Sequence, residues 1–210
     1  MINLKIAIQK SGRLNEDSLT LLKECGISIN NGKDQLMAQA SNFRLDVLYL
    51  RNSDIPRYVR DGVADIAIIG DNTEKEKKTG IRHVLDLGFS RCRLSIAVPK
   101  NVDFQDISYL QGKKIATSYP NSLKDFLTEN DIEAEIHEIS GSVEIAPNIG
   151  LADAICDLVS SGSTLFKNGL KEVYKIFESQ AILVANSGLC GEKQELLAQL
   201  VFRIKAVLAA

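Results

Sequence analysis

The stretch KKIATSYPNSLKDFLTENDI, residues 113–132, decides how the chain is organised, because it repeats the pattern with which the chain begins. It has the pattern of a short apolar strand, a polar loop and a helix. The opening of the chain has the same order, with the strand-like LKIAIQ (4–9) followed by the helix-like EDSLTLLKECGI (16–27). Lys-Ile-Ala occurs in both strands, at 5–7 and at 114–116. The repeat indicates two similar structural halves.

A second match supports the same division. GVAD (62–65) recurs as GLAD (150–153), and each leads into an apolar strand. Two matches in the same order, with the same surrounding order of strand and helix, predict a two-lobe architecture with internal similarity.

Strands and helices alternate through the first half. RLDVLYLR (44–51) alternates like a strand, SDIPRYVRDG (53–62) is typical of a helix capped by Ser53, and VADIAIIG (63–70) is an apolar strand. This alternation predicts an α/β fold with a mostly parallel sheet.

Two further apolar strands, CRLSIAVPK (92–100) and QAILVAN (180–186), bracket the middle segment. We therefore expect lobe I to contain residues 1–90 and 181–210, and lobe II to contain residues 91–180. The chain would cross between the lobes twice, which favours a central cleft and a hinge.

Composition excludes several classes of function. The 210 residues have a formal net charge of −2, so no global charge marks a nucleic-acid or membrane binder. No apolar run approaches the roughly 18 residues of a membrane span, and the N-terminus has too short an apolar run for a secretory signal. The four cysteines form no CxxC pair, so we expect buried thiols and no zinc or disulfide framework. We expect a cytoplasmic protein.

ADAICDLVSSGSTLF, residues 152–166, combines a buried-looking strand with one carboxylate and a hydroxyl-rich loop. Ligands of open α/β sheets collect beyond the carboxyl ends of strands, where loops lead into helices. Asp157 could accept hydrogen bonds from ribose hydroxyls, and successive loop amides could wrap a phosphate. The alternative is a helix N-cap beside a surface aspartate. The loop residues in question are Ser160, Ser161, Gly162, Ser163 and Thr164.

QKSGRL (9–14) offers a second turn for an anion, with Lys10 and Arg13 flanking Gly12 just before a helix. A guanidinium grips a phosphate with two parallel bonds, whereas an ammonium is a mobile point charge. The alternative is a pair of solvated cations at a loop end. One anion loop in each lobe indicates a ligand with phosphates at both ends.

In these motifs and in longer stretches the chain resembles the ATP phosphoribosyltransferase family, whose members catalyse the first step of histidine biosynthesis. The resemblance covers nearly the whole chain. The stretches that match are KIAIQKSGRL (5–14), LRNSDIPRYVRDGVADIAIIGDN (50–72), DLGFSRCRLSIAVP (86–99), KIATSYP (114–120), GSVEIAPNIGLADAICDLVSSGSTL (141–165) and NGLKEV (168–173).

The resemblance implies a two-lobe fold like that of periplasmic solute-binding proteins (type II). It also implies a reaction that joins adenine N1 of ATP to C1′ of phosphoribosyl pyrophosphate and releases pyrophosphate. Mg²⁺ would be the cofactor, carried by the substrate phosphates and not by protein side chains.

The resemblance also assigns residues. Asp157 and the 160–164 loop would hold the ribose and 5-phosphate of phosphoribosyl pyrophosphate. Arg13, in the family's GR turn, would stabilise the departing pyrophosphate, with Lys10 as a further catalytic group. The candidates for nucleotide or pyrophosphate binding are Gly12, Lys33, Arg51, Asp54 and Glu144.

Three of these candidates have alternatives. Arg51 could merely pair with Asp54, and Glu144 could complement a helix dipole instead of binding a hydroxyl. Many relatives have an arginine just before the strand that starts near Leu36, where this chain has Lys33, Asp34 and Gln35. Either Lys33 substitutes for that arginine or a pyrophosphate contact is missing.

Two other functions compete with the enzyme. A non-catalytic solute-binding module could use the same fold. A salvage phosphoribosyltransferase would have two adjacent acidic residues before its loop, but here Cys156 precedes the single Asp157.

The last stretch, EKQELLAQLVFRIKAVLAA (192–210), is typical of one amphipathic helix with no stop signal before residue 210. The family has a long form with a C-terminal histidine-binding domain, and a short form regulated by a partner that resembles histidyl-tRNA synthetase. The motifs favour a long-form catalytic core without its regulatory domain, with a true short form as the alternative. We expect a homo-oligomer, or a hetero-oligomer with that partner if the chain is the short form.

Overall fold

The computed structural model describes residues 2–30 and 35–209. The chain divides into two compact units, which are described separately below: unit 1 contains Met1–Ser90 and Gln180–Ala210, and unit 2 contains Arg91–Ser179. Gln180, expected in lobe II, belongs to unit 1. The chain passes from one unit to the other after Ser90 and again after Ser179.

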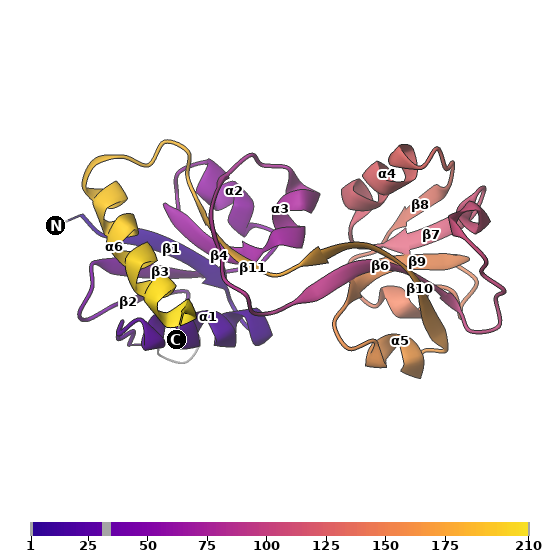
Figure 1. Ribbon diagram of the computed structural model, residues 1–210, viewed down its shortest axis with the longest axis horizontal. Helices are drawn as coiled ribbons and strands as arrows, with labels where there is room; N and C mark the ends of the chain where they lie inside the picture. The colour runs from indigo at the N-terminus through magenta and orange to yellow at the C-terminus, as the bar shows by residue number, and fades with distance from the viewer. Residues whose placement is uncertain (1, 31–34, 210) are drawn as a thin grey trace. The chain divides into compact units, whose positions relative to one another are not determined.

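Unit 1 has a six-stranded sheet in the order β2-β3-β1-β4-β11-β5 within the described residues (Figure 1). Its strands are β1 (Leu4–Gln9), β2 (Met37–Gln39), β3 (Leu45–Leu50), β4 (Ile66–Gly70), β5 (Arg82–Asp86) and β11 (Ala181–Ala185). Its helices are α1 (Arg13–Glu24), α2 (Ile55–Arg60), α3 (Asp71–Lys77) and α6 (Gly191–Leu208).

Unit 2 has a five-stranded sheet in the order β10-β6-β9-β7-β8. Its strands are β6 (Cys92–Pro99), β7 (Lys114–Thr117), β8 (Glu135–Glu138), β9 (Ala154–Val159) and β10 (Leu170–Ser179). Its helices are α4 (Pro120–Glu129) and α5 (Ser163–Lys167), with the short 3₁₀ helices η1 (Ile107–Leu110) and η2 (Val143–Ile145).

The two sheets share one topology. Five strands of unit 1 (β3-β1-β4-β11-β5) and the five of unit 2 (β8-β7-β9-β6-β10) follow the same order, with two parallel pairings and then two antiparallel ones. The sheets are therefore mixed, and the expectation of mostly parallel sheets is wrong. The antiparallel strands come from segments beside the two crossings, which hydrophobic periodicity does not reveal.

The repeated Lys-Ile-Ala and GxAD motifs form the same pair of backbone-anchoring hydrogen bonds in both units. In unit 1, the Asp65 carboxylate accepts a hydrogen bond from the N–H of Lys5 (2.8 Å), and the Asp65 N–H donates to the Lys5 carbonyl (2.9 Å). In unit 2, Asp153 and Lys114 make the same two bonds at 2.9 and 2.8 Å. The aspartate of each GxAD motif thus fixes the start of each Lys-Ile-Ala strand.

Helices cover both faces of each sheet, which positions the loops at the strand ends. In unit 1, leucines of α1 and α6 pack on one face and apolar residues of α2 on the other. In unit 2, α4 and η1 cover one face, while the shorter η2 and α5 cover the other. The face beneath η2 and α5 is the one that carries Asp157.

Some element boundaries differ from those expected. Helix α1 begins at Arg13, directly after Gly12, instead of at residue 16. Ser53 does not cap α2: Asp54 occupies the N-cap position without a capping bond, and Ser53 Oγ donates to the Asp54 carboxylate (3.1 Å). Cys190 is exposed, unlike the buried Cys25 and Cys156.

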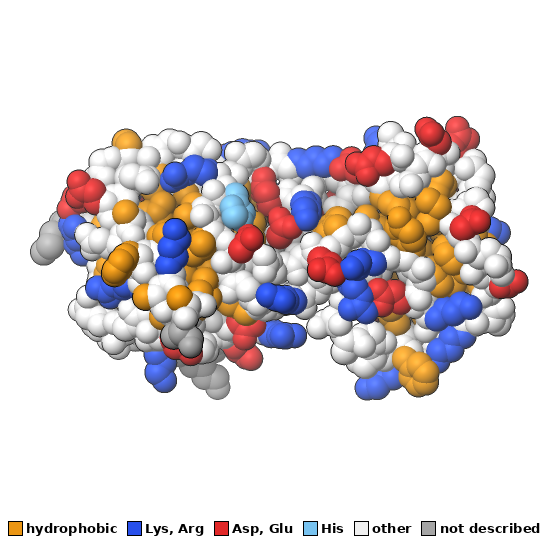
Figure 2. Space-filling model, viewed as in Figure 1, with side chains coloured by type: hydrophobic (Ala, Val, Ile, Leu, Met, Phe, Trp, Pro, Cys, Tyr) orange, Lys and Arg blue, Asp and Glu red, His pale blue; other side chains and the backbone are white. Residues whose placement is uncertain are grey.

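Charged side chains of both signs are interspersed over the visible face of each unit (Figure 2). No helix within the described ranges is both long and apolar enough to cross a bilayer. Anion recognition must therefore be sought in local features.

Candidate functional site

The loop after β9 is built to present backbone amides. Gly162 occupies the N-cap of α5 with φ of 77°, a conformation that a residue with a side chain adopts at a cost. The first amides of α5 have no partner within the helix, as in any helix, and Gly162 has no side chain to cap them. Ser161 Oγ lies 3.1 Å from Ser163 Oγ and accepts its amide only at 3.4 Å. The loop serines are exposed and do little as caps, which favours the anion-binding interpretation over a simple cap.

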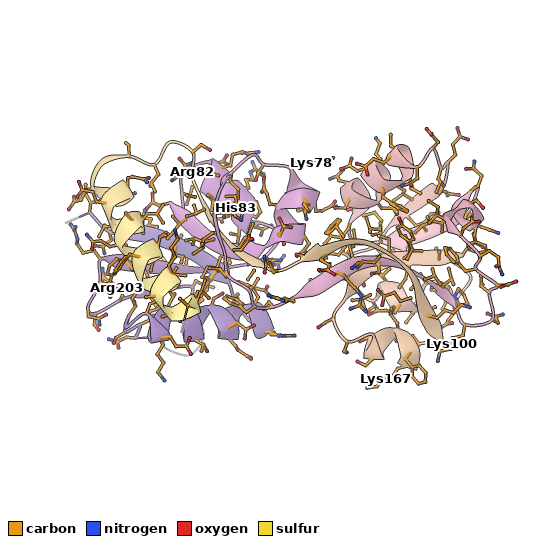
Figure 3. All side chains as sticks on the ribbon, viewed as in Figure 1. Lys78, Arg82, His83, Lys100, Lys167 and Arg203 are labelled. Carbon is orange, nitrogen blue, oxygen red and sulfur yellow. The ribbon has the colours of Figure 1, made fainter. Side chains whose placement is uncertain are left out.

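The far end of α5 is anchored. Lys167 is the last residue of α5, and Lys100 lies near this end of the helix (Figure 3). Lys100 Nζ donates to the Phe166 carbonyl (3.1 Å) and lies 3.4 Å from the centre of the Phe166 ring. The Asn148 amide donates to the Asn168 carbonyl (3.0 Å). These contacts fix α5, so the loop at its start is held at one end by a rigid element.

Asp157 lies on the same sheet face as Ile155 and Val159, because side chains alternate along β9. Burial in this apolar face raises the pKa of its carboxyl to about 6, against the partial opposing effect of the Leu158 N–H, which donates to it at 2.8 Å. The Glu144 carboxylate adds a smaller upward effect. This effect indicates that Glu144, at η2, lies in the neighbourhood of Asp157.

The turn after β1 has a comparable design in unit 1. Gly12 is the N-cap of α1 with φ of 88°, again in the region that favours glycine. The Gln9 side-chain amide donates to the Ser11 carbonyl, and the Asn15 amide donates to the Gln9 carbonyl, both at 2.7 Å. With the carbonyls of Gln9 and Ser11 occupied, the turn is suited to present N–H groups to an anion. The sequence analysis did not identify Gln9 and Asn15 as residues that shape this turn. The signal that could have identified them is an amide side chain on each side of a glycine turn.

Lys10 and Arg13 are both exposed beside this turn. The Arg13 guanidinium lies 3.7 Å from the Asp17 carboxylate, which also accepts a bond from Ser90 Oγ (2.7 Å). The Arg13 side chain is 67% exposed, so this loose pair leaves it accessible to a ligand phosphate.

Arg51 is brought to the same sheet edge as Lys10, because the Lys10 N–H donates to the carbonyl of the preceding Leu50 (2.7 Å). The structure describes both Arg51 and Asp54 and records no ion pair between them, so that alternative is wrong. Asp54 lines a surface cavity of about 710 Å³ together with Arg57 and other residues of α2 and the end of α3. Lys33 lies outside the described residues.

The candidates thus form two groups, one at the end of β1 and β3 in unit 1 and one at the end of β9 in unit 2. In the part of the chain that the structure describes, no three His, Cys, Asp or Glu side chains are arranged as a metal site. The charged side chains and backbone amides of the two groups are suited to bind anions and hydroxyl groups.

Comparisons with known proteins agree in pointing to one family. A family model described as ATP phosphoribosyltransferase matches residues 51–206. The curated ATP phosphoribosyltransferase of Cytophaga hutchinsonii is 59% identical over 204 residues, which are 97% of this chain and 71% of that protein.

Among solved structures, the "ATP phosphoribosyl transferase (HisG:HisZ) complex from Thermotoga maritima" contains a similar chain, with a TM-score of 0.84, 29% identity and 98% of both chains covered. The substrate-binding protein of an amino acid ABC transporter matches with a TM-score of 0.63 at 13% identity, over 97% of this chain and 92% of that one. The second likeness concerns the fold alone. Together they confirm the two-lobe, periplasmic-binding-protein-like α/β fold expected from the sequence.

Proposed function

The chain belongs to the ATP phosphoribosyltransferase family, and we propose that it transfers the phosphoribosyl group of phosphoribosyl pyrophosphate to N1 of the ATP adenine. The bond from C1′ to the pyrophosphate oxygen breaks, a bond from C1′ to N1 forms, and pyrophosphate leaves. This reaction is the first step of histidine biosynthesis, and we propose that it takes place in the cytoplasm.

The observation that carries the proposal is the arrangement of Asp157 and the loop after β9. The amides at the start of α5 have no N-cap side chain to bind them, hydroxyls of the loop are exposed, and the Asp157 carboxyl lies just before them on the strand. In our proposal the 160–164 loop binds the 5-phosphate, and Asp157 accepts hydrogen bonds from the ribose hydroxyls with Glu144 beside it. A carboxyl with a pKa of about 6 is mostly ionised at pH 7 to 8, as an acceptor of hydroxyl protons requires.

The turn in unit 1 is proposed to act on the pyrophosphate. Negative charge grows on the pyrophosphate oxygens as the C1′ bond breaks, and Arg13 can meet it with two parallel hydrogen bonds. Lys10 and Arg51 supply further positive charge at the same sheet edge, and the amides after Gly12 supply dipoles. No nucleophile from the protein is required, because adenine N1 is the nucleophile and the protein's task is to position the two substrates.

Mg²⁺ is proposed as the cofactor. Asp157 and Glu144 fit the role of hydroxyl acceptors better than that of a metal cage, because a cage usually needs further oxygen ligands beside them. When bound to the substrate phosphates, Mg²⁺ would offset the charge of the leaving pyrophosphate.

Assembly is also a proposal. The similar Thermotoga chain was solved in a HisG:HisZ complex, and this chain spans 71% of its Cytophaga relative. We propose that the chain works as an oligomer, either with copies of itself or with a histidyl-tRNA synthetase-like regulatory subunit.

The test is pyrophosphate release measured with a coupled assay. The purified chain is mixed with ATP, phosphoribosyl pyrophosphate and Mg²⁺, with each component omitted in turn. Release that requires both substrates supports the proposal. Binding of both substrates without release would favour the competing non-catalytic binding module.

A further inference from the structure

Arg93, Ser95 and Glu172 form a hydrogen-bonded network outside the predicted site. This network contacts the 160–164 loop, which is called the phosphate loop below. The Arg93 guanidinium, on β6, donates from Nε and Nη2 to the two carboxylate oxygens of Glu172, each at 2.5 Å. Its third nitrogen, Nη1, donates to the Ser160 carbonyl (3.1 Å). Ser95, which is 1% exposed, donates from Oγ to Glu172 (2.8 Å). One guanidinium thus joins β10 to the first residue of the loop.

Strand β10, which carries Glu172, pairs irregularly with β6. Its register against β6 shifts between Glu172 and Tyr174 and again between Lys175 and Phe177. Each shift inserts one extra residue, so the side chains of one face recur every third residue instead of every second. Glu172, Lys175 and Glu178 consequently pair with Ala97, Ser95 and Arg93. Ser95 also pairs with Asp157 on its other side, so the network lies on the sheet face that carries Asp157.

We propose that Arg93, held by Glu172 and Ser95, is a positioning residue that orients the phosphate loop for the 5-phosphate. The inference rests on the proposed function of that loop. In a trans peptide the carbonyl of one residue and the N–H of the next point in opposite directions. A Ser160 carbonyl held by Arg93 therefore turns the Ser161 N–H away from Arg93, and a flip of this peptide would present a carbonyl oxygen where an amide is needed.

Arg93 acts through the loop and not as a ligand of the phosphate. Its bidentate partner neutralises its charge, and hydrogen bonding to Glu172 raises the pKa of Arg93 and lowers that of Glu172. Three of its five N–H groups are engaged by Glu172 and Ser160, which holds the guanidinium in place beside the loop. The side chains are 31% and 25% exposed, so the pair is sheltered enough to hold one geometry.

The experiment uses the full 210-residue chain and two variants, Arg93→Met and Arg93→Lys. Lys175→Met is the matched control, because Lys175 lies on the same sheet face, and its recorded hydrogen bond and ion pair are with Glu178 and not with the 160–164 loop. We expect Arg93→Met to raise the KM for phosphoribosyl pyrophosphate about tenfold and to leave the KM for ATP within about twofold. Arg93→Lys should not restore the KM, because one ammonium cannot make the three directed bonds. Lys175→Met should behave like the wild type.

A rise of both KM values to the same extent, or of neither, in folded Arg93→Met would overturn the proposal. If Arg93→Met does not fold, Glu172→Gln takes its place. It loosens Arg93 without removing volume and should also raise the KM for phosphoribosyl pyrophosphate. A lowered KM in Glu172→Gln would instead show that a freed Arg93 binds phosphate itself, and would refute the positioning role.

Two-dimensional amide NMR of the substrate-free protein separates this inference from the proposed function. The amide resonances of residues 160–164 should move in Arg93→Met and stay in place in Lys175→Met. If the wild type releases no pyrophosphate, the proposed function fails, while movement of these resonances still supports the positioning role. Unmoved resonances refute it.

Discussion

Ionised Asp157 should destabilise the ligand-free protein. Burial raises the pKa of this carboxyl to about 6, from a usual value of 3.8. A folded-state pKa that is raised in an acid means that the folded protein binds the proton more tightly than the unfolded chain does. The stabilisation by the bound proton is complete below about pH 4, is lost as pH rises from 4 to 6, and is absent above. The difference at neutral pH is about 3 kcal/mol.

Asp157→Asn should therefore raise the free energy of unfolding while it impairs function. The gain over the wild type should be near zero at pH 4, grow up to about pH 6 and remain constant from there to pH 8. Thermal or urea unfolding across this range measures it. The same variant should lose most of the stabilisation by phosphoribosyl pyrophosphate, because an amide is a weaker acceptor for the ribose hydroxyls and retains no charge.

Glu129→Gln is the control, since Glu129 is exposed on α4 of the same unit. It removes one negative charge without relieving burial, so its effect on stability should be small at every pH. If Asp157→Asn is no more stable than the wild type at pH 8, or if its gain does not depend on pH, the proposed burial of charge at Asp157 is refuted.

Other predictions concern the loop after β9 and the turn after β1. Gly162→Ala should cost about 1 kcal/mol of folding free energy, because alanine is strained at φ of 77°, and it should also weaken the binding of phosphoribosyl pyrophosphate. Unfolding curves measure the first effect and the KM measures the second, and unchanged values would exclude a role for this backbone conformation. Thr164→Val should raise the same KM by roughly fivefold through loss of one hydroxyl, with the melting temperature as the control for folding. Arg13→Ala should lower kcat more than it raises KM, because its contact strengthens as charge develops; a change in KM with normal turnover would make Arg13 a binding residue only.

Local sequence patterns located the two glycine turns of the candidate site. The Gly12 and Gly162 turns follow apolar strands and precede helices, and these short-range patterns are governed by backbone preference and hydrophobic periodicity. The repeated Lys-Ile-Ala and GxAD motifs predicted the internal repeat. In each unit the aspartate of GxAD binds the start of the Lys-Ile-Ala strand, so both motifs recur together. The family resemblance assigned Asp157 and the loop to the sugar phosphate.

Tertiary structure decided what depends on distant partners. The antiparallel pairing of β11 with β4 and of β6 with β9 joins segments that are far apart in the sequence, so no local pattern distinguishes it from parallel pairing. The pKa of Asp157 depends on burial under η2 and α5, which no neighbour in sequence specifies.

The contrast is sharpest in β10. In the sequence LKEVYKIFES, the charged residues Glu172, Lys175 and Glu178 recur every third position, which fits neither a regular strand nor a helix. Two bulges against β6 place Lys175 and Glu178 on the same face as Glu172, and Glu172 forms an ion pair with Arg93 of the neighbouring strand. The sequence by itself determined where most strands and the two candidate loops lie, because those follow from local preference. Which charges meet across a sheet was decided only by register, because register is set by the packing of both strands at once.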